Sequence, residues 1–420
     1  MDRLLHNSER DVCVVGAGHI GLPWAAALAN KGYRITCVDI NENRVDDINN
    51  GSCIFDEPRL EEYLQNAIRT DRLKATTEPE TVSSANIVAF TLNAPQDELD
   101  DYLSTIKTYN SYISAHQIIV NRTTLPVPLV RSTIRKIVDG MDISESDLHY
   151  VTFPERLAEG KAIEEIENLP KIVGSSTPTA RKAISKLLSE FSGDINYTDP
   201  ETAMLVKLID NSYRDARFAI ANQFAIIADE LGLDAHEAVE LANKDYPRND
   251  IPSPGTVGGK CLIKDPHFLT DQHLPFNEST PNLFRKTREV NRAFEKRIAN
   301  QVSDFEPKKV AILGTSYKKG IGDETESPSL HIKDIISSQG IATDCYDPYV
   351  PGRDNLEETI EGADVVLIAV NHLEFEKNEE KIKTLASGPI IDVWGIFQLT
   401  SEIFRPGKAA LQQVPTRKTD

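Results

Sequence analysis

A short apolar run meets three closely spaced glycines in the stretch Asp11-Val-Cys-Val-Val-Gly-Ala-Gly-His-Ile-Gly21. The residues that follow, 22–32, are rich in alanine and leucine and end in glycine, which predicts a helix. A second apolar run, residues 34–38, stops at Asp39. This order of strand, G-x-G-x-x-G loop, helix, strand and acid predicts a βαβ unit that binds a dinucleotide.

The glycines of this unit allow a tight turn and let a pyrophosphate approach the helix N-terminus. Asp39 can accept hydrogen bonds from the ribose hydroxyls and would repel a 2′-phosphate, so we expect NAD rather than NADP. A G-x-G-x-x-G motif alone is weak evidence, and a glycine-rich turn without a ligand is the alternative. The flanking strands and the acid at the right distance favour the dinucleotide site.

Outward from this unit, strands alternate with helical segments. Residues 85–91, 117–121 and 150–153 are predicted strands, and the charged segment near 57–70 is a predicted helix. This alternation predicts a parallel, doubly wound sheet, in which ligands bind at the carboxyl ends of the strands. The loops after these strands carry hydroxyl groups and charges that could face a ligand or, as is more usual for such residues, only solvent.

The middle of the chain predicts one long helix. From Asp199 to Leu231 there is no glycine, Pro200 suits the first helical position, and apolar residues recur at helical spacing. Roughly 30 residues give a helix of about 45 Å, long enough to be a spine between two sheets. Lys207 and Asn211 are four apart and share one face of it.

The last third of the chain repeats the first in outline. Residues 340–347 match residues 32–39, and a final strand is expected at 389–393. This part lacks G-x-G-x-x-G but keeps Gly314 and the segment 317–320, which suit a second phosphate-bearing ligand. The sequence therefore predicts an α/β protein with two doubly wound, Rossmann-like parallel sheets and a helical middle. The expected domains are 1–198 for the dinucleotide, 199–304 for dimerisation and catalysis, and 305–420 for the second ligand.

A glycine-rich loop between the long helix and the last domain is the candidate catalytic segment. It reads Ser253-Pro-Gly-Thr-Val-Gly-Gly-Lys-Cys-Leu-Ile-Lys-Asp265. Its glycines and prolines predict a shaped loop rather than a helix, with backbone amides close to a ligand. Cys261 beside Asp265 suits covalent catalysis on a carbonyl, whereas a structural cysteine is the plainer alternative.

Composition limits the classes of function. The 420 residues include 65 acidic and 46 basic side chains, a net charge of −19, which disfavours nucleic-acid binding through a basic surface. No apolar run approaches the ~20 residues needed to cross a bilayer, and the N-terminus lacks a signal-peptide core. Five widely spaced cysteines without a Cys-x-x-Cys pair disfavour disulfides and zinc, so we expect a reduced, cytoplasmic protein and no metal. The polar tail, residues 412–420, is expected to be disordered.

From about Val12 to Phe397, the chain resembles the nucleotide-sugar 6-dehydrogenase family. The motifs that carry the resemblance occur in order: Gly16–Gly21, Thr123–Pro126, Pro154–Gly160, Lys207–Asn211, Gly255–Cys261 with Asp265, and Tyr317-Lys318. This family oxidises the C6 alcohol of a nucleotide sugar twice with two NAD⁺, through an aldehyde and a cysteine thioester.

The resemblance assigns roles to six catalytic residues. It implies that Cys261 is the nucleophile and that Lys207 and Asn211 stabilise the oxyanion. It further implies that Asp265, with Thr124 and a water molecule, handles protons in the first oxidation. Glu155, with Glu159 nearby, would activate the hydrolytic water.

The resemblance also implies the binding residues. The expected NAD contacts are Gly16, Gly18, His19, Ile20, Gly21, Asp39, Arg44, Thr91 and Thr124. The expected UDP-sugar contacts are Glu155, Arg156, Leu157, Lys207, Asn211, Arg248 (from the same or a neighbouring subunit), Gly255, Gly258, Tyr317 and Lys318. A homodimer or higher homo-oligomer is expected, because the long helix has more apolar surface than one chain can cover.

Two departures from the family pattern stand out: Ile263 replaces a proline, and Thr325 replaces an arginine that usually helps to hold the ligands. The Pro-Glu-Arg form at 154–156 and the Tyr-Pro-Arg at 246–248 resemble the acetamido-sugar branch, so the expected substrate is a UDP-N-acetylhexosamine, with UDP-N-acetylmannosamine ahead of UDP-N-acetylglucosamine. The alternatives are a UDP-glucose dehydrogenase, a two-electron dehydrogenase of the hydroxyacyl type that needs no cysteine, and a ligand-binding relative without turnover.

Overall fold

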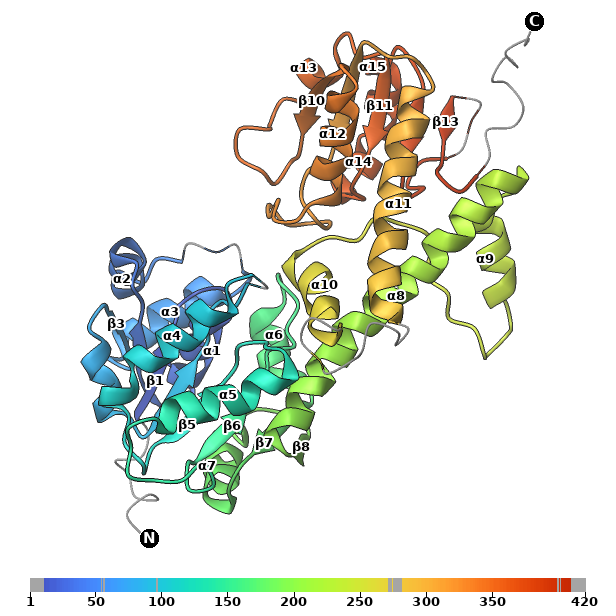
Figure 1. Cartoon of the computed structure of the whole chain (residues 1–420). Helices are drawn as coiled ribbons and strands as arrows, with labels where there is room; N and C mark the ends of the chain where they lie inside the picture. Colours follow the sequence, from blue (N-terminus) through green and yellow to red (C-terminus); the bar gives the residue numbers. More distant parts are fainter. Residues whose placement is uncertain are drawn as a thin grey trace, which may run out of the picture. The chain divides into compact units, whose positions relative to one another are not determined.

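The protein was analysed as a computed structural model, which describes residues 11–53, 55, 57–95, 97–270, 274, 282–398, 400 and 402–408 (Figure 1). The chain forms two compact units that divide within one long helix. The first unit runs to Asp210 and the second begins at Asn211. The tail predicted to be disordered lies outside the described residues. The predicted division into three domains remains a prediction.

The first unit is built on an eight-stranded sheet. Its strands are β1 (Asp11–Val15), β2 (Arg34–Val38), β3 (Leu73–Thr76), β4 (Ile87–Phe90), β5 (Ile118–Asn121), β6 (Tyr150–Thr152), β7 (Lys171–Ser175) and β8 (Ile195–Thr198). They lie in the order β3-β2-β1-β4-β5-β6-β7-β8, and every neighbouring pair is parallel except β6 and β7. The strand order reverses between β1 and β4, which is where open α/β sheets bind ligands.

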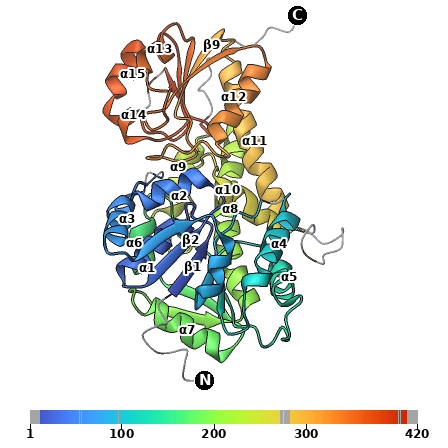
Figure 2. The same cartoon turned by 90° about the vertical axis from the view of Figure 1, so that its left-hand side faces the viewer.

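Helices cover both faces of this sheet (Figure 2). The helical elements of the first unit are α1 (Gly21–Asn30), α2 (Glu42–Asn49), α3 (Leu60–Arg69), η2 (Pro79–Ser84), α4 (Leu99–Thr108), η3 (Asn110–Tyr112), α5 (Val127–Val138), α6 (Ala162–Asn168) and α7 (Pro178–Leu188). Successive residues of β1 therefore enter different cores: Val12 and Val14 pack with α1 and α3, whereas Cys13 and Val15 pack with α4 and α5. Burial on both faces explains the continuous apolar runs of the sequence.

The second unit contains a five-stranded, all-parallel sheet in the order β10-β9-β11-β12-β13. Its strands are β9 (Lys309–Leu313), β10 (Ala342–Tyr346), β11 (Val365–Ile368), β12 (Ile390–Asp392) and β13 (Ile403–Phe404). Its helical elements after the long helix are α9 (Ala235–Asn243), α10 (Lys260–Lys264), η4 (Asp265–Leu269), α11 (Leu283–Ser303), α12 (Pro328–Ser338), α13 (Leu356–Ile360), α14 (Leu373–Lys377) and α15 (Glu379–Leu385). One core lies against α11 and α12 and the other against α13, α14 and α15 (Figure 2).

The long helix, α8, spans Pro200–Leu231 and begins at the proline that the sequence predicts for its first position. The predicted fold class is thereby confirmed: two parallel, Rossmann-like sheets and a helical middle with a long helix. The antiparallel pair of β6 and β7 was not predicted. It follows a connection through the short α6, and pairing direction is a tertiary property that local apolar patterns do not encode.

The two sheets repeat the same hydrogen bonds at the ends of their central strands. The N–H of Gly16 donates to Val38 O at 2.8 Å, and the N–H of Gly314 donates to Tyr346 O at 2.7 Å. Both glycines have positive φ, 93° and 91°, which a side chain would strain. The internal repeat predicted from sequence therefore extends to the backbone geometry of the two ligand loops.

Candidate active site

The glycine loop of the first unit lies at the carboxyl ends of β1 and β4. Thr91, just after β4, closes it by donating its hydroxyl to Val15 O at 3.0 Å and to Gly16 O. A Cβ on Gly21 would lie 1.9 Å from Gly16 O, so no other residue fits there. A Cβ on Gly18, by contrast, would have no atom within 4 Å. The open side at Gly18 suits the close approach of a pyrophosphate.

Three further residues of the expected NAD set lie around this loop. Ile20 is the N-cap of α1, whose start carries no side-chain cap, so the helix end is suited to an anion. His19 is exposed, and its ring centroid lies 3.9 Å from that of Phe55. Thr124 follows β5 and is half-buried, in a loop that Asn121 fixes through hydrogen bonds to the N–H and carbonyl of Thr123, each at 3.1 Å.

The acid at the end of β2 is already engaged by the protein. Asp39 is 6% exposed and accepts hydrogen bonds from the N–H groups of Ala17 (2.8 Å) and Asn41 (3.0 Å). The guanidinium of Arg44 pairs with the same carboxylate at 3.0 Å. The carboxylate thus ties the second strand to the glycine loop, and a cation stands beside the position expected for the ribose.

The loop after β6 carries a buried ion pair. The carboxylate of Glu155 pairs with the guanidinium of Arg122, which lies between the rings of Trp24 and Phe153, 4.4 Å from each ring centroid. The other carboxylate oxygen accepts the N–H groups of Arg156 (2.7 Å) and Leu157 (2.8 Å). Burial lowers the pKa of Arg122 to about 9. Both oxygens of Glu155 are therefore in use.

The rest of this loop is held by three carboxylates. Arg156 pairs with Asp210 at 2.7 Å and donates to Pro170 O at 3.3 Å. Glu165 accepts the N–H of Ala158 at 2.6 Å. Glu57 accepts the N–H groups of residues 160 and 162, at 2.8 and 2.7 Å. Arg156 thus fixes the shape of the loop through protein contacts. Leu157 packs against the core, and Glu159 is half-buried.

In the second unit, Cys261 is exposed and is the second residue of α10. The predicted loop is correct for residues 253–259 but wrong from Lys260 onward, where α10 and then η4 form. The reason is that every glycine of the segment precedes Lys260, and the sequence Lys-Cys-Leu-Ile-Lys contains no helix breaker.

The carboxylate of Asp265 is fully buried and accepts a 2.6 Å hydrogen bond from the amide of Asn211. Its other oxygen lies 3.7 Å from the amine of Lys264 and has no hydrogen bond among the described residues. Lys207 lies one turn before Asn211 on α8 and is 7% exposed. The structure therefore brings Asn211 and Asp265 together and places Cys261 on the same short helical segment as Asp265.

Packing requires glycine at three positions of the loop 253–259 that precedes α10. A Cβ on Gly255 would lie 2.6 Å from the ring of Trp394, and one on Gly258 would lie 2.4 Å from Pro328. Gly259 has φ 84° and lies against the ring of Tyr317. Packing against Trp394 and Pro328 thus accounts for the lack of a side chain at Gly255 and Gly258, and the expectation that their backbone amides come close to a ligand remains a prediction.

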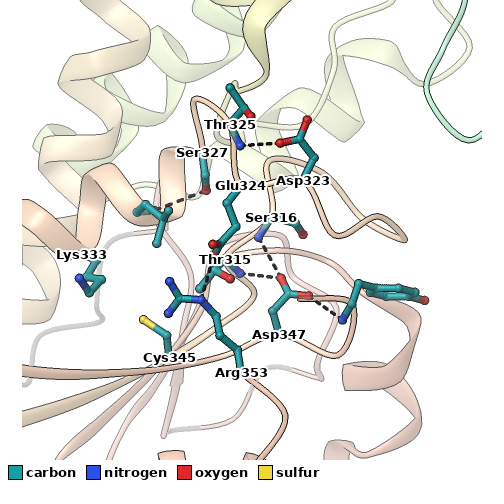
Figure 3. Close-up of polar contacts among 12 residues, drawn as sticks. Thr315, Ser316, Asp323, Glu324, Thr325, Ser327, Lys333, Cys345, Asp347 and Arg353 are labelled. Atoms are coloured by element: carbon teal, nitrogen blue, oxygen red, sulfur yellow. Dashed lines mark hydrogen bonds and ion pairs between the residues drawn. The ribbon is translucent and has the colours of Figure 1, made fainter. Parts of the chain in front are cut away.

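The loop after β9, which carries Tyr317 and Lys318, is held by a buried acid and a buried histidine; Figure 3 shows the acid, Asp347, with Thr315 and Ser316. Asp347 accepts the N–H groups of Thr315 (2.7 Å) and Ser316 (2.9 Å). His372 contacts the same carboxylate at 3.2 Å, and its other ring nitrogen accepts the N–H of Gly320 at 3.1 Å. Burial raises the pKa of Asp347, but these hydrogen bonds outweigh burial and hold it at about 2.

At the position where the family has an arginine, the N–H of Thr325 donates to Asp323 at 2.7 Å (Figure 3). The adjacent Glu324 pairs with Arg353, from the loop after β10, at 2.8 Å. Arg248 is exposed and stacks on Tyr246, 4.7 Å from the ring centroid. An arginine from another segment, Arg353, thus pairs with the residue next to Thr325.

Sequence reasoning missed Arg122, Asp347 and His372. Arg122 directly precedes the motif Thr123–Pro126, and the sequence alone predicts that its charge faces solvent. Only the structure shows that it lies between two aromatic rings and pairs with Glu155. A signal existed for Asp347, because it matches Asp39 in the internal repeat. His372 carries no local pattern. Within the described residues, no group of three or more His, Cys, Asp or Glu side chains could hold a metal ion, and no described helix is both long and apolar enough to cross a membrane.

Three successive segments of the chain match the domains of one family, the UDP-glucose/GDP-mannose dehydrogenase family. The NAD binding domain matches residues 10–192, the central domain residues 201–293 and the UDP binding domain residues 311–399.

Individual relatives are similar along the whole chain. The UDP-N-acetyl-D-mannosamine dehydrogenase of Methanococcus vannielii is 32% identical and covers 94% of this chain and 95% of its own. The NDP-N-acetyl-D-galactosaminuronic acid dehydrogenase of Ralstonia nicotianae is 31% identical and covers 94% and 98%. The solved structure of the UDP-D-ManNAc dehydrogenase of Pyrococcus horikoshii superposes with a TM-score of 0.87 at 30% identity, covering 95% of this chain and 100% of its own.

Proposed function

Because the chain belongs to the UDP-glucose/GDP-mannose dehydrogenase family of NAD-dependent nucleotide-sugar dehydrogenases, we propose that it oxidises the C6 alcohol of a UDP-N-acetylhexosamine to the uronic acid. The observation that carries this proposal is the exposed thiol of Cys261, four residues before the buried carboxylate of Asp265. A two-electron dehydrogenase would not need that thiol. The overall reaction consumes one alcohol, two NAD⁺ and one water, and yields the carboxylate, two NADH and three protons.

In the proposed first oxidation, Asp265 takes the proton of the C6 hydroxyl by way of a water molecule, with Thr124 as a hydroxyl partner. Bound NAD⁺ supplies the hydride acceptor for each oxidation. The thiolate of Cys261 then forms an S–C6 bond with the aldehyde, whose oxygen becomes a hydroxyl. Lys207 and Asn211 donate to the oxygen as negative charge develops there, which is worth roughly 3 kcal/mol per donor.

Loss of the second hydride and of the hydroxyl proton leaves a thioester on Cys261. Water then adds to C6, the C–S bond breaks, and the sulfur leaves as thiolate. Glu155 is the proposed acceptor of the water proton. The ion pair with Arg122 supports a second role for Glu155, as the anchor of its loop. The base role and the anchor role predict different products when Glu155 is replaced.

The names of the relatives favour an acetamido sugar, and among such sugars UDP-N-acetylmannosamine. Arg156 adds little to this substrate assignment, because Asp210 and Pro170 O already engage its guanidinium. UDP-glucose therefore remains the runner-up substrate.

A panel of UDP- and GDP-sugars, each incubated with NAD⁺, tests the proposal. We expect two NADH per UDP-N-acetylmannosamine and a uronate product by mass. One NADH per sugar would favour a two-electron dehydrogenase, and no NADH with any sugar would favour a binding protein without turnover. A higher kcat/KM for UDP-glucose would overturn the substrate assignment.

The thiol has its own test. Cys261→Ser should abolish uronate formation and retain NAD⁺ binding, because only a thiolate forms the thioester. Cys345→Ser is the matched control, since Cys345 is a half-buried thiol on β10 and burial raises its pKa. Uronate formation at an unchanged rate by Cys261→Ser would refute covalent catalysis.

We also propose that the enzyme works in the cytoplasm as a homodimer or a larger homo-oligomer. None of the five cysteines, all of which lie in the described residues, is in a disulfide, which suits a reducing compartment. The support for self-association is a row of exposed apolar side chains on α8, here named the α8 stripe, which comprises Leu205, Ile209, Tyr213, Ile220, Phe224, Ile227 and Leu231.

A further inference from the structure

One side-chain amide clamps the backbone of Gly255, near the start of the glycine-rich loop. Asn222, on α8, is fully buried. Its amide nitrogen donates to Gly255 O and its amide oxygen accepts the N–H of Gly255, both at 2.9 Å. A buried peptide group without such partners would cost on the order of 1–3 kcal/mol per group. The clamp therefore opposes any displacement of Gly255 away from α8.

An aromatic ring closes the other side of the same residue. The α-carbon of Gly255 faces the ring of Trp394, so closely that a Cβ would lie 2.6 Å from a ring atom. The ring itself is anchored, because its indole N–H donates to Ala369 O at 2.9 Å. Gly255 is thus held between a polar clamp and a fixed apolar surface.

A buried carboxylate sets the orientation of the clamp. The second N–H of the Asn222 amide donates to Asn291 at 2.9 Å, and Asn291 donates to Asp215 at 2.8 Å. Asp215, which also pairs with Arg288 at 2.6 Å, can only accept when ionised. Asn291 must therefore turn its NH₂ group toward Asp215, and Asn222 must turn its NH₂ group toward the amide oxygen of Asn291. Flipping either amide would place its oxygen against two acceptor oxygens.

The clamp on Gly255 lies four residues before Gly259, where the turn that begins the cysteine helix is located. Gly259 donates its N–H to Glu326 O at 3.3 Å and adopts φ 84°. Cys261 then follows as the second residue of α10. Because Gly255 and Gly259 are both fixed, the intervening chain has little freedom, and the position of the thiol follows from these two anchors.

We infer that Asn222 is a positioning residue of the reaction, which holds the loop so that the Cys261 thiol captures the aldehyde before it escapes. This inference rests on the proposed role of Cys261 as the nucleophile. A thiol displaced by about 1 Å can lose on the order of a hundredfold in rate. The first oxidation does not use the thiol, so a loosened loop should release aldehyde.

The test measures how much aldehyde escapes. Asn222→Asp keeps the shape of the side chain but turns an acceptor toward Gly255 O and toward Asn291. With the sugar that is turned over in the panel, we expect the NADH yield to fall from two toward one per sugar, and semicarbazide to trap the aldehyde. The KM for NAD⁺ should not change. Two NADH per sugar and no trapped aldehyde would overturn the inference.

A second variant covers the case in which Asn222→Asp does not fold. Gly255→Ala leaves the polar chain intact and displaces the same peptide from the Trp394 side, so it should also release aldehyde. The matched control is Asn49→Ala, because Asn49 makes the same clamp on Ala75, at 2.8 and 3.0 Å, in the first unit. It should keep two NADH per sugar.

Cys261→Ser in the same assay separates this inference from the proposed function. If that variant still forms uronate with two NADH per sugar, the proposed covalent role of Cys261 fails, and the positioning inference fails with it; a wild type that makes no NADH with any sugar of the panel would instead mean that the proposed function fails. If it stops at the aldehyde while the Asn222→Asp and Gly255→Ala variants keep the wild-type ratio, only the positioning role fails.

Discussion

At the scale of single residues, Glu155 is both the proposed base and part of the architecture of its loop. Its two oxygens are occupied by Arg122 and by two backbone N–H groups. Removing one partner of a buried ion pair usually costs about 3–5 kcal/mol, because the other charge is left uncompensated. A general base must, however, release one of these contacts to receive a proton from water.

Glu155→Gln separates these two roles. If Glu155 is the base, the amide cannot take the proton, and the thioester should accumulate on Cys261 as a covalent adduct detected by mass spectrometry. We expect kcat to fall by about 10²-fold or more. Glu164→Gln, an exposed carboxylate on α6, is the control and should leave kcat unchanged. Loss of activity without an adduct would mean that Glu155 serves only as an anchor.

We propose that Asp39 and Arg44 together decide the choice of cofactor. Asp39→Asn would remove the charge that opposes a 2′-phosphate and would release Arg44, now paired at 3.0 Å, to face that phosphate. We expect the ratio of kcat/KM for NADP⁺ to that for NAD⁺ to rise by about tenfold, equivalent to about 1.4 kcal/mol. An unchanged ratio would show that other groups exclude the phosphate. Asp46→Asn, exposed on α2, is the control.

At the scale of elements, the two sheets have an acid at the equivalent position, Asp39 and Asp347, but use it differently. Both acids accept the N–H that follows the first loop glycine: Asp39 from Ala17 and Asp347 from Thr315. Asp347 additionally holds Ser316 and His372, so its carboxylate is saturated within the protein. The last domain therefore cannot offer this acid to a ribose and uses it as the internal support of the Tyr317–Lys318 loop.

This support predicts a pH dependence of stability. The folded pKa of Asp347, about 2, is depressed below the unfolded value of ~3.9, so its contribution is present above pH ~4 and lost as pH falls toward 2. The shift corresponds to roughly 2–3 kcal/mol. Asp347→Asn should lower the free energy of unfolding of the second unit by about this amount at pH 7 and by little at pH 2, measured by denaturant titration.

Asp344→Asn is the control for this prediction, because Asp344 lies on β10, the strand that directly precedes Asp347, but its side chain is 56% exposed in a surface pair with Lys309. Surface pairs contribute roughly 0–1 kcal/mol. Equal losses in the two variants at pH 7, or a loss in Asp347→Asn that persists at pH 2, would contradict the assigned role of Asp347.

At the scale of the whole molecule, the α8 stripe holds seven of the fourteen large apolar side chains that are exposed among the described residues. Its seven side chains are between 37% and 66% exposed. At 3.6 residues per turn they fall within about 100° of the helix circumference. A continuous apolar row of this kind favours association with a second apolar surface.

The double variant Ile220→Asp/Phe224→Asp should be a monomer in light scattering at concentrations where the wild type is a dimer or larger. Two carboxylates would have to be buried without partners for the association to persist. Arg214→Asp, exposed on α8 outside the stripe, should keep the wild-type mass. A wild-type protein that is already monomeric would refute the proposed self-association.

Much of the fold was predictable because its signals are local. The glycine loop, the strand runs buried on both faces and the proline at the start of α8 each act within a few residues. Elements without a clear local sequence pattern were not predicted. Strand β8 at the sheet edge is only partly buried and carries polar residues, so no apolar run marked it.

The sequence by itself determined the order of elements and the residue types available for chemistry: a thiol, two carboxylates, a lysine and an amide at set intervals. The tertiary structure alone decided which of these groups are already engaged. Arg122 meets Glu155, Asn222 meets Gly255, and Asp347 meets His372, across separations of 33, 33 and 25 residues. Such pairings depend on how packed elements bring distant segments together, and no local periodicity encodes that.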